Sequence, residues 1–307
     1  MMKSIWKNTI IALLAFCPLV APAQTLSKIG MGYAQTSVNT AVFRQSSVAT
    51  RGDWQFAAYY DADGYVVLAK RQLSGAEEDG AWTVVRTQYK GNVSDAHNVI
   101  SIGIDGDGFV HLSFDHHGHP LRYCKGKRPY GLEVGELQSM DGHDESNVTY
   151  PKFYNMPNGD LLFAYRSGSS GRGNLVMKRY VVAEKRWQSL QDVLIDGENK
   201  RNAYWQLCVD KSGAIHVSWV WRETPDVATN HDLCYARSDD GGVTWRRSDG
   251  SQYKLPITAE SAETAFVIPQ NSELINQTSM TADDEGNPFI ATYWREQDSK
   301  VPQYRLV

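Results

Sequence analysis

The sequence predicts an all-β fold, a β-propeller of four-stranded antiparallel blades. Three observations indicate it: short alternating strands in place of helical patterns, five similar hairpin turns, and a strand motif that recurs after four of them. The turns are Asp63-Gly64, Asp107-Gly108, Asn158-Gly159, Ser212-Gly213 and Glu285-Gly286. Asp-Gly and Asn-Gly are strong hairpin signals because these residues tolerate a positive φ.

The strands after four of these turns align with one another. They read GFVHLSFD (108–115), GDLLFAYR (159–166), GAIHVSWV (213–220) and GNPFIATY (286–293), with an aromatic residue near the end of each. Successive turn glycines lie 44, 51, 54 and 73 residues apart. One propeller blade takes about 40–50 residues, so we expect about five blades, some with insertions.

A second pattern supports the same fold. Residues 238–245 read SDDGGVTW and match S-x-D-x-G-x-T-W, the Asp-box turn of sialidase-like propellers. Asp-boxes lie on hairpins away from active sites, so the match indicates the fold and not the chemistry. The chain stops in a strand-like stretch, 301–307, without a closing segment. We therefore expect a propeller domain over residues 24–307 that is incomplete at its C-terminus.

An export signal is predicted for residues 1–23. Lys3 and Lys7 precede a short apolar run, and Ala21-Pro22-Ala23 supplies the small-x-small cleavage pattern. The apolar run is too short to span a bilayer. We expect a soluble chain that begins near Gln24 and is secreted or periplasmic, with no membrane partner.

Composition excludes some function classes. Removing residues 1–23 leaves 29 basic and 35 acidic residues, a net charge of −6, which argues against nucleic acid as a partner. An anionic substrate remains compatible, because a local arginine cluster can bind one. Three cysteines remain, Cys124, Cys208 and Cys234, and an odd number is not a disulfide framework. We expect a monomer.

Four residues are expected to meet at the ends of two hairpins. His97 lies eleven residues before Gly108 and His117 nine after it, while Tyr150 and Arg166 lie nine before and seven after Gly159. Residues equally far from a hairpin turn lie side by side. Neighbouring blades would place both pairs on one face, where propellers bind ligands.

Other residues are candidates for substrate binding. Asn98 and His116 adjoin the paired histidines, and Arg222 and Arg295 end the corresponding strands of later blades. The two arginines fit either a role on the shared face or ordinary ion pairs. His111 and His216 each lie three residues after a turn glycine, inside a strand, and are expected to be structural.

The residue types favour elimination over hydrolysis. A glycosidase needs a pair of carboxylates, and Asp115 is the only acid that we expect nearby. Arg166, helped by His117, can neutralise a uronate carboxylate and so acidify the C5 proton. Tyr150 beside a cation is expected to have a lowered pKa and to act as base and then acid. His97 is the rival base, or the group that orients Tyr150 or stabilises developing charge.

These segments resemble the exported seven-bladed propeller polysaccharide lyases that cleave ulvan, the sulfated rhamnose–uronate polymer of green algae. The resemblance runs from about Val38 to the end of the chain. It implies catalytic roles for His97, His117, Tyr150 and Arg166, with tyrosine as base and acid and arginine with histidine as neutralisers. The matching segments are 95–98 (DAHN), 114–119 (FDHHGH), 150–151 (YP) and 165–168 (YRSG).

The same superfamily leaves two other activities open, a lyase or an α-L-rhamnosidase acting on rhamnosyl-glucuronate of plant gums. The rhamnosidases use a histidine on the opposite face, where Gln45 stands here, and glutamine cannot act as a general acid. The third hypothesis for the function is a non-catalytic glycan-binding propeller.

The resemblance implies that a metal can be bound in a structural role, and no cofactor is expected for catalysis. Asp226, His231 and Cys234 lie within nine residues and offer ligands for a structural zinc or calcium ion, although ordinary loop residues fit the same pattern.

Overall fold

The computed structural model describes residues 26–41, 43–44, 47–74 and 81–307. The predicted export signal, residues 1–23, lies outside these ranges, as does Gln45. Within them the regular structure is almost all strand, with two short 3-10 turns, η1 (Val182–Glu184) and η2 (Val227–Thr229). The predicted all-β class is confirmed. No helix in the described ranges has both the length and the apolar character needed to cross a membrane.

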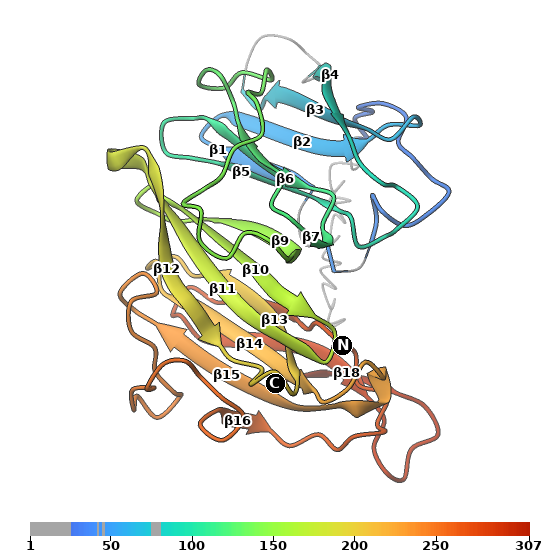
Figure 1. Ribbon diagram of the computed structural model, residues 1–307, viewed down its shortest axis with the longest axis vertical. Coiled ribbons are helices and arrows are strands. Elements are labelled where there is room, and N and C mark those ends of the chain that lie inside the picture. The colour runs from blue at the N-terminus through green and yellow to red at the C-terminus, as the bar shows by residue number, and fades with distance from the viewer. Residues whose placement is uncertain (1–25, 42, 45–46, 75–80) are drawn as a thin grey trace, which may run out of the picture.

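The first part of the chain forms two small antiparallel sheets (Figure 1). One is an up-and-down sheet of four strands, β1 (Val48–Arg51), β2 (Trp54–Tyr60), β3 (Tyr65–Gln72) and β4 (Thr83–Lys90). The other has three strands, β5 (Ile100–Ile104), β6 (Val110–Phe114) and β8 (Tyr123–Lys125).

The second part forms a larger sheet of two antiparallel meanders and then a further small sheet. The first meander contains β9 (Val148–Asn155), β10 (Leu161–Ser169), β11 (Arg172–Val181) and β12 (Arg186–Ile195). The second contains β13 (Asn202–Val209), β14 (Ile215–Arg222), β15 (Asn230–Ser238) and β16 (Glu263–Phe266). The short strand β7 (His117–His119) pairs with β9, and the small sheet contains β17 (Ser279–Ala282), β18 (Pro288–Trp294) and β19 (Gln303–Leu306).

The sheets follow one another in a propeller-like order. The first strands of successive sheets are neighbours: β1 and β2 contact β5, β5 contacts β9, β9 contacts β13, and β13 contacts β17. A single parallel bridge between Gly173 and Asn202 joins the two meanders of the large sheet. Of the predicted four-stranded blades, β1–β4 is the one that stands as a separate four-stranded sheet among the described strands. The count of about five blades stays a prediction.

Four of the five predicted turns share a carboxylate that fixes them. An aspartate three residues before the turn glycine accepts the backbone N–H groups two and four residues further along. It is Asp61, Asp105, Asp210 or Asp283 in turn. The glycines of these turns have φ between 81° and 91°, a region that costs most other residues energy. Local chemistry therefore sets the hairpins on which the site depends.

Two of these aspartates also hold a buried histidine. His111 contacts Asp105 through Nε2 (3.0 Å) and Tyr123 through Nδ1 (2.8 Å). In a later sheet, His216 contacts Asp210 and the hydroxyl of Tyr235 in the same way. Both histidines are fully buried, so their expected structural role is confirmed.

The Asp-box forms the predicted compact turn. Asp240 accepts the backbone N–H of Thr244 and the hydroxyl of Ser238. Trp245 is fully buried and donates its indole N–H to the carbonyl of Gly242. The motif thus anchors the turn after β15 to the apolar core of the large sheet.

Candidate active site

The predicted meeting of His97 and His117 is confirmed. Their rings stack with centroids 4.0 Å apart and planes 19° from parallel. The two residues come from different elements, because His97 lies in the loop before β5 and His117 lies on β7, opposite Thr149 of β9. The other face of His97 stacks on Phe43, at 5.4 Å between centroids. The pair therefore lies where the β5–β6–β8 sheet meets the large sheet.

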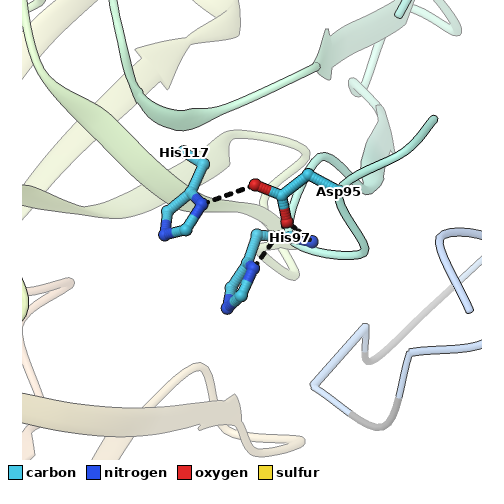
Figure 2. Close-up of side chains that lie close together, drawn as sticks. All are labelled: Asp95, His97 and His117. Carbon is cyan, nitrogen blue, oxygen red and sulfur yellow. Dashed lines mark hydrogen bonds and ion pairs between the residues drawn. The ribbon is translucent and has the colours of Figure 1, made fainter. Parts of the chain in front are cut away.

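Asp95 contacts both histidines, a role that the sequence analysis did not predict. Its Oδ1 contacts His97 Nδ1 at 2.7 Å, and its Oδ2 contacts His117 Nδ1 at 2.6 Å (Figure 2). The expected nearby acid, Asp115, instead pairs with Arg122 and accepts the backbone N–H of Asn92. The D-x-H spacing is a signal that could have revealed Asp95. An aspartate can accept the backbone N–H two residues further on in an Asx-turn, and Asp95 does so with His97.

The carboxylate of Asp95 is held ionised. Burial alone would raise its pKa, but hydrogen bonds from the backbone N–H of His97 and from the rings of His117 and His97 outweigh burial. The net effect lowers the pKa of Asp95 to about 2. The site thus contains a permanent negative charge behind the histidine pair.

Tyr150 has a strained backbone. Its φ is +56°, in the left-handed region that an aromatic residue rarely adopts. The pairing of β9 with β10 shifts at this point, so that Thr149 faces Arg166 and Lys152 faces Ala164. Such bulges redirect side chains and are common beside active sites. The ring of Tyr150 packs edge-on against Phe43 at 5.2 Å, with His97 at 5.9 Å and Tyr204 at 6.2 Å.

The expected lowering of the Tyr150 pKa is wrong. Burial, with a contribution from Tyr204, raises the pKa of Tyr150 to about 12, although Arg166, Gln277 and Arg222 act in the opposite direction. The side chain is shielded from solvent, because only 6% of the residue is exposed. Desolvation therefore dominates over the neighbouring cations. The free protein holds Tyr150 as a neutral phenol at neutral pH.

Arg166 lies beside Tyr150 with its charge unbalanced. Its Cζ atom is 5.1 Å from the Tyr150 ring centroid, and the residue is 3% exposed. The guanidinium makes no ion pair with any described residue, and its buried Nε has no hydrogen-bond partner there. A buried cation without a carboxylate is costly to keep. This is the expected state of a group that receives an anionic ligand.

A glycine makes room for Arg166. A Cβ atom on Gly173 would lie 2.8 Å from Arg166 Cδ and 2.5 Å from Asn202 Oδ1. Asn202 is fully buried, and neither of its side-chain amide atoms has a partner among the described residues. Arg166 and Asn202 thus share a packed position with unused hydrogen-bonding capacity.

The predicted substrate-binding residues divide into three groups. Arg222 lies near the site: it donates to the Tyr204 hydroxyl (3.2 Å) and to Asn276 Oδ1 (3.3 Å). Asn98 and His116 are fully buried, and Asn98 Oδ1 and His116 Nδ1 have no hydrogen-bond partner among the described residues, so their role in binding substrate stays a prediction. Arg295 pairs with Glu273 at 2.8 Å and donates to the carbonyl of Asn271, so it makes the ordinary ion pair that was the alternative.

The predicted metal ligands do not come together. Asp226 accepts the backbone N–H of Ala228 at the start of η2. His231 contacts Glu223 and Asp232, and Cys234 is a fully buried free thiol in the apolar core. Within the described part of the chain, the group of metal-binding side chains that does converge is Asp95, His97 and His117. The structure thus does not bring together the three residues predicted to bind zinc or calcium at 226–234.

The buried His116 is expected to make the folded chain less stable in acid. Its Nε2 accepts the backbone N–H of Arg122, and burial, reinforced by the charges of Arg122 and His119, lowers the pKa of His116 to about 3. Above an ordinary histidine pKa of about 6.5, the folded and unfolded chains are both neutral at this residue. Below it, the unfolded chain takes up a proton that the folded chain refuses, so the free energy of unfolding falls by roughly 1.4 kcal/mol per pH unit until about pH 3.

Urea denaturation between about pH 7 and about pH 4 measures this effect. The His116→Gln variant keeps an acceptor for the Arg122 N–H but cannot titrate, so its free energy of unfolding should fall less steeply with acid than that of the parent. His111, whose pKa is lowered mainly by burial, still titrates in both proteins. Equal slopes for parent and variant would contradict the assignment of a buried neutral His116.

The chain is similar to known proteins over most of its length. A family model described as "BNR repeat-containing family member" matches residues 54–307. The "Ulvan lyase, short isoform" of Alteromonas sp. (strain LOR) is 26% identical over 196 residues, which cover 57% of this chain and 36% of that protein. The "Ulvan lyase" of Nonlabens ulvanivorans is 23% identical over 229 residues, covering 64% of this chain and 48% of the relative.

Solved structures show the same fold. The polysaccharide lyase Uly1 has a TM-score of 0.68 at 16% identity, over 93% of this chain and 73% of its own. An ulvan lyase described as bound to -[GlcA(1-4)Rha3S]- also has a TM-score of 0.68, at 18% identity, over 87% of this chain and 69% of its own. The resemblance to ulvan-lyase-like propeller polysaccharide lyases is thus confirmed. The chain spans between about a third and about a half of the curated relatives that it matches.

Proposed function

The chain belongs to the BNR repeat-containing family, and we propose that it is a polysaccharide lyase that cleaves ulvan by β-elimination at a 4-linked uronate. The observation that carries this proposal is the buried, unpaired Arg166 next to Tyr150 and the stacked histidines. The names of the relatives, and the -[GlcA(1-4)Rha3S]- bound to one solved lyase, support the substrate.

Arg166 and His117 would neutralise the uronate carboxylate. A guanidinium can donate two parallel hydrogen bonds to a carboxylate, and these are strong when the surroundings are dry. Neutralising that charge makes the C5 proton more acidic. The electron pair of the C5–H bond then forms the C4–C5 double bond, and the C4–O4 bond breaks.

Two groups are needed to move the protons, and the pKa of Tyr150 separates their roles. Ionising a phenol with a pKa of about 12 at pH ~8 costs roughly 5 kcal/mol, which disfavours Tyr150 as the base. As a phenol it is ready to protonate the leaving O4 atom. We therefore assign the base to His97, whose ring lies 5.9 Å from that of Tyr150, and the acid to Tyr150.

The activity is tested by incubating the folded chain with ulvan and following the ultraviolet absorbance of the unsaturated uronate product. Rising absorbance with oligosaccharides detected by mass would support the proposal. Release of free rhamnose without absorbance would favour a rhamnosidase, and turnover of a rhamnosyl-glucuronate gum alone would move the proposal to that substrate. Binding without turnover would leave a glycan-binding propeller. Assaying culture medium, periplasm and cytoplasm of the native host tests export.

The pH dependence of kcat/KM distinguishes the two candidate bases. With an imidazole base, kcat/KM should be level at alkaline pH up to about pH 10, because the phenolic acid remains protonated. A Tyr150 phenolate base would instead give a tenfold rise per pH unit throughout that range. The profile is measured from initial rates at low ulvan concentration, with circular dichroism at each pH as the control for unfolding.

A further inference from the structure

Asp95 contacts both catalytic candidates of the histidine pair with separate oxygens. Oδ1 takes two donors, the backbone N–H of His97 at 2.9 Å and His97 Nδ1 at 2.7 Å, whereas Oδ2 faces His117 Nδ1 at 2.6 Å. These contacts hold the carboxylate in its ionised form. It is one-third exposed, as are the two rings, so the trio lies at the surface of the site.

These contacts determine where the ring protons are. An ionised carboxylate can only accept hydrogen bonds, so both Nδ1 atoms must carry a proton. A neutral imidazole then has its lone pair on Nε2, as a base requires, whereas an imidazolium carries a second proton on Nε2 and can donate it to a carboxylate, as a neutraliser requires. In Figure 2 the second ring nitrogen of His97 and of His117 lies on the side away from Asp95. The stacked rings therefore present two Nε2 atoms side by side.

We propose that Asp95 is a positioning residue that fixes the tautomer of both histidines and aims their Nε2 atoms at the substrate. This inference rests on the proposed lyase function and deepens it, because a histidine base needs its lone pair on the exposed nitrogen. One carboxylate thus orients the proposed base, His97, and the proposed neutraliser, His117, together. The arrangement explains how a loop residue and a strand residue keep a common direction.

Replacing Asp95 by asparagine should affect the two histidines differently. The amide oxygen is expected at the position of Oδ1, because that oxygen receives two donors. The NH₂ group then faces His117 Nδ1, and two donors cannot share one hydrogen bond. His117 must move its proton to Nε2, while His97 keeps the tautomer of the parent. Asparagine has nearly the same shape as aspartate, so the fold is preserved.

Nitrogen NMR of the full chain with ¹⁵N-labelled histidine tests this directly, with His97→Gln and His117→Gln variants to assign the signals. The parent should show Nδ1 protonated in both rings, and Asp95→Asn should shift only His117. Asp107→Asn, an exposed turn residue that also removes one negative charge, should change neither. On ulvan, Asp95→Asn should lower kcat, because the carboxylate charge that stabilises the imidazolium formed on His97 is lost, with a much smaller change in KM.

Two spectral results would overturn the inference: a parent in which either ring is protonated on Nε2 and not on Nδ1, or an Asp95→Asn protein with unchanged His117. A zinc ion found on the purified parent, and displaced together with these signals by a chelator, would also overturn it in favour of a metal site. The tautomers are measured without substrate. Expected spectra from a protein that cleaves no uronate polymer would count against the proposed function instead.

Discussion

Replacing Tyr150 by phenylalanine is expected to lower turnover of ulvan by about 10²–10⁴-fold, the usual contribution of a positioned acid–base group. The hydroxyl is the proton source proposed for the leaving O4 atom. Its removal keeps the ring contacts with Phe43 and Tyr204. Loss of one buried hydroxyl should change the free energy of unfolding by about 1 kcal/mol. The effect on activity therefore exceeds the effect on stability.

Tyr204→Phe is the matched control. Tyr204 is equally buried and lies next to Tyr150, and its hydroxyl contacts Ser170 and Arg222. It should lose far less turnover, because no proton transfer is assigned to it. Initial rates of product absorbance and urea denaturation of both variants complete the comparison. A Tyr150→Phe protein with the activity of Tyr204→Phe would rule out the assigned acid.

The hairpins could be predicted because their signals are local. A turn glycine with an aspartate three residues before it, as at Gly108 and Gly213, specifies φ and the hydrogen bonds within a few residues. Alternation along the strands then sets the approximate partners. The approach of Tyr150 to Arg166 follows from this counting, although the bulge moves the register so that Thr149, not Tyr150, faces Arg166.

The contacts between sheets could not be predicted in this way. His117 was expected beside His97 on one hairpin, but Asp115 has a φ of +67° and the chain leaves the small sheet there. His117 then pairs with Thr149 of the large sheet, and Asp95 closes the gap to His97. The burial of Asn98 and His116 depends on the same packing. Sequence spacing carries no information on which side of such a junction a residue lies.

Removing the unpaired charge of Arg166 is expected to lower activity without lowering stability. Two charge-assisted hydrogen bonds to the substrate carboxylate, each contributing about 1.5–3 kcal/mol, would be lost in Arg166→Met. Turnover should fall by at least about 10²-fold. In the free protein the charge is in contact with the Tyr150 ring, but the guanidinium has no ion-pair partner among the described residues to offset its burial. Replacing it by an apolar side chain of similar length should leave the free energy of unfolding unchanged or raise it by about 1–2 kcal/mol.

Arg179→Met provides the reverse case. Arg179 pairs with Asp160, with Nε at 2.8 Å and Nη2 at 2.6 Å from the same carboxylate oxygen, in the hairpin that carries Arg166. Its replacement should destabilise the chain and preserve turnover by the molecules that remain folded. Arg166→Lys should recover charge but not the two parallel hydrogen bonds, and so should fall between parent and Arg166→Met. Destabilisation of Arg166→Met as large as that of Arg179→Met would mean that Arg166 is a structural residue and not an unoccupied anion site.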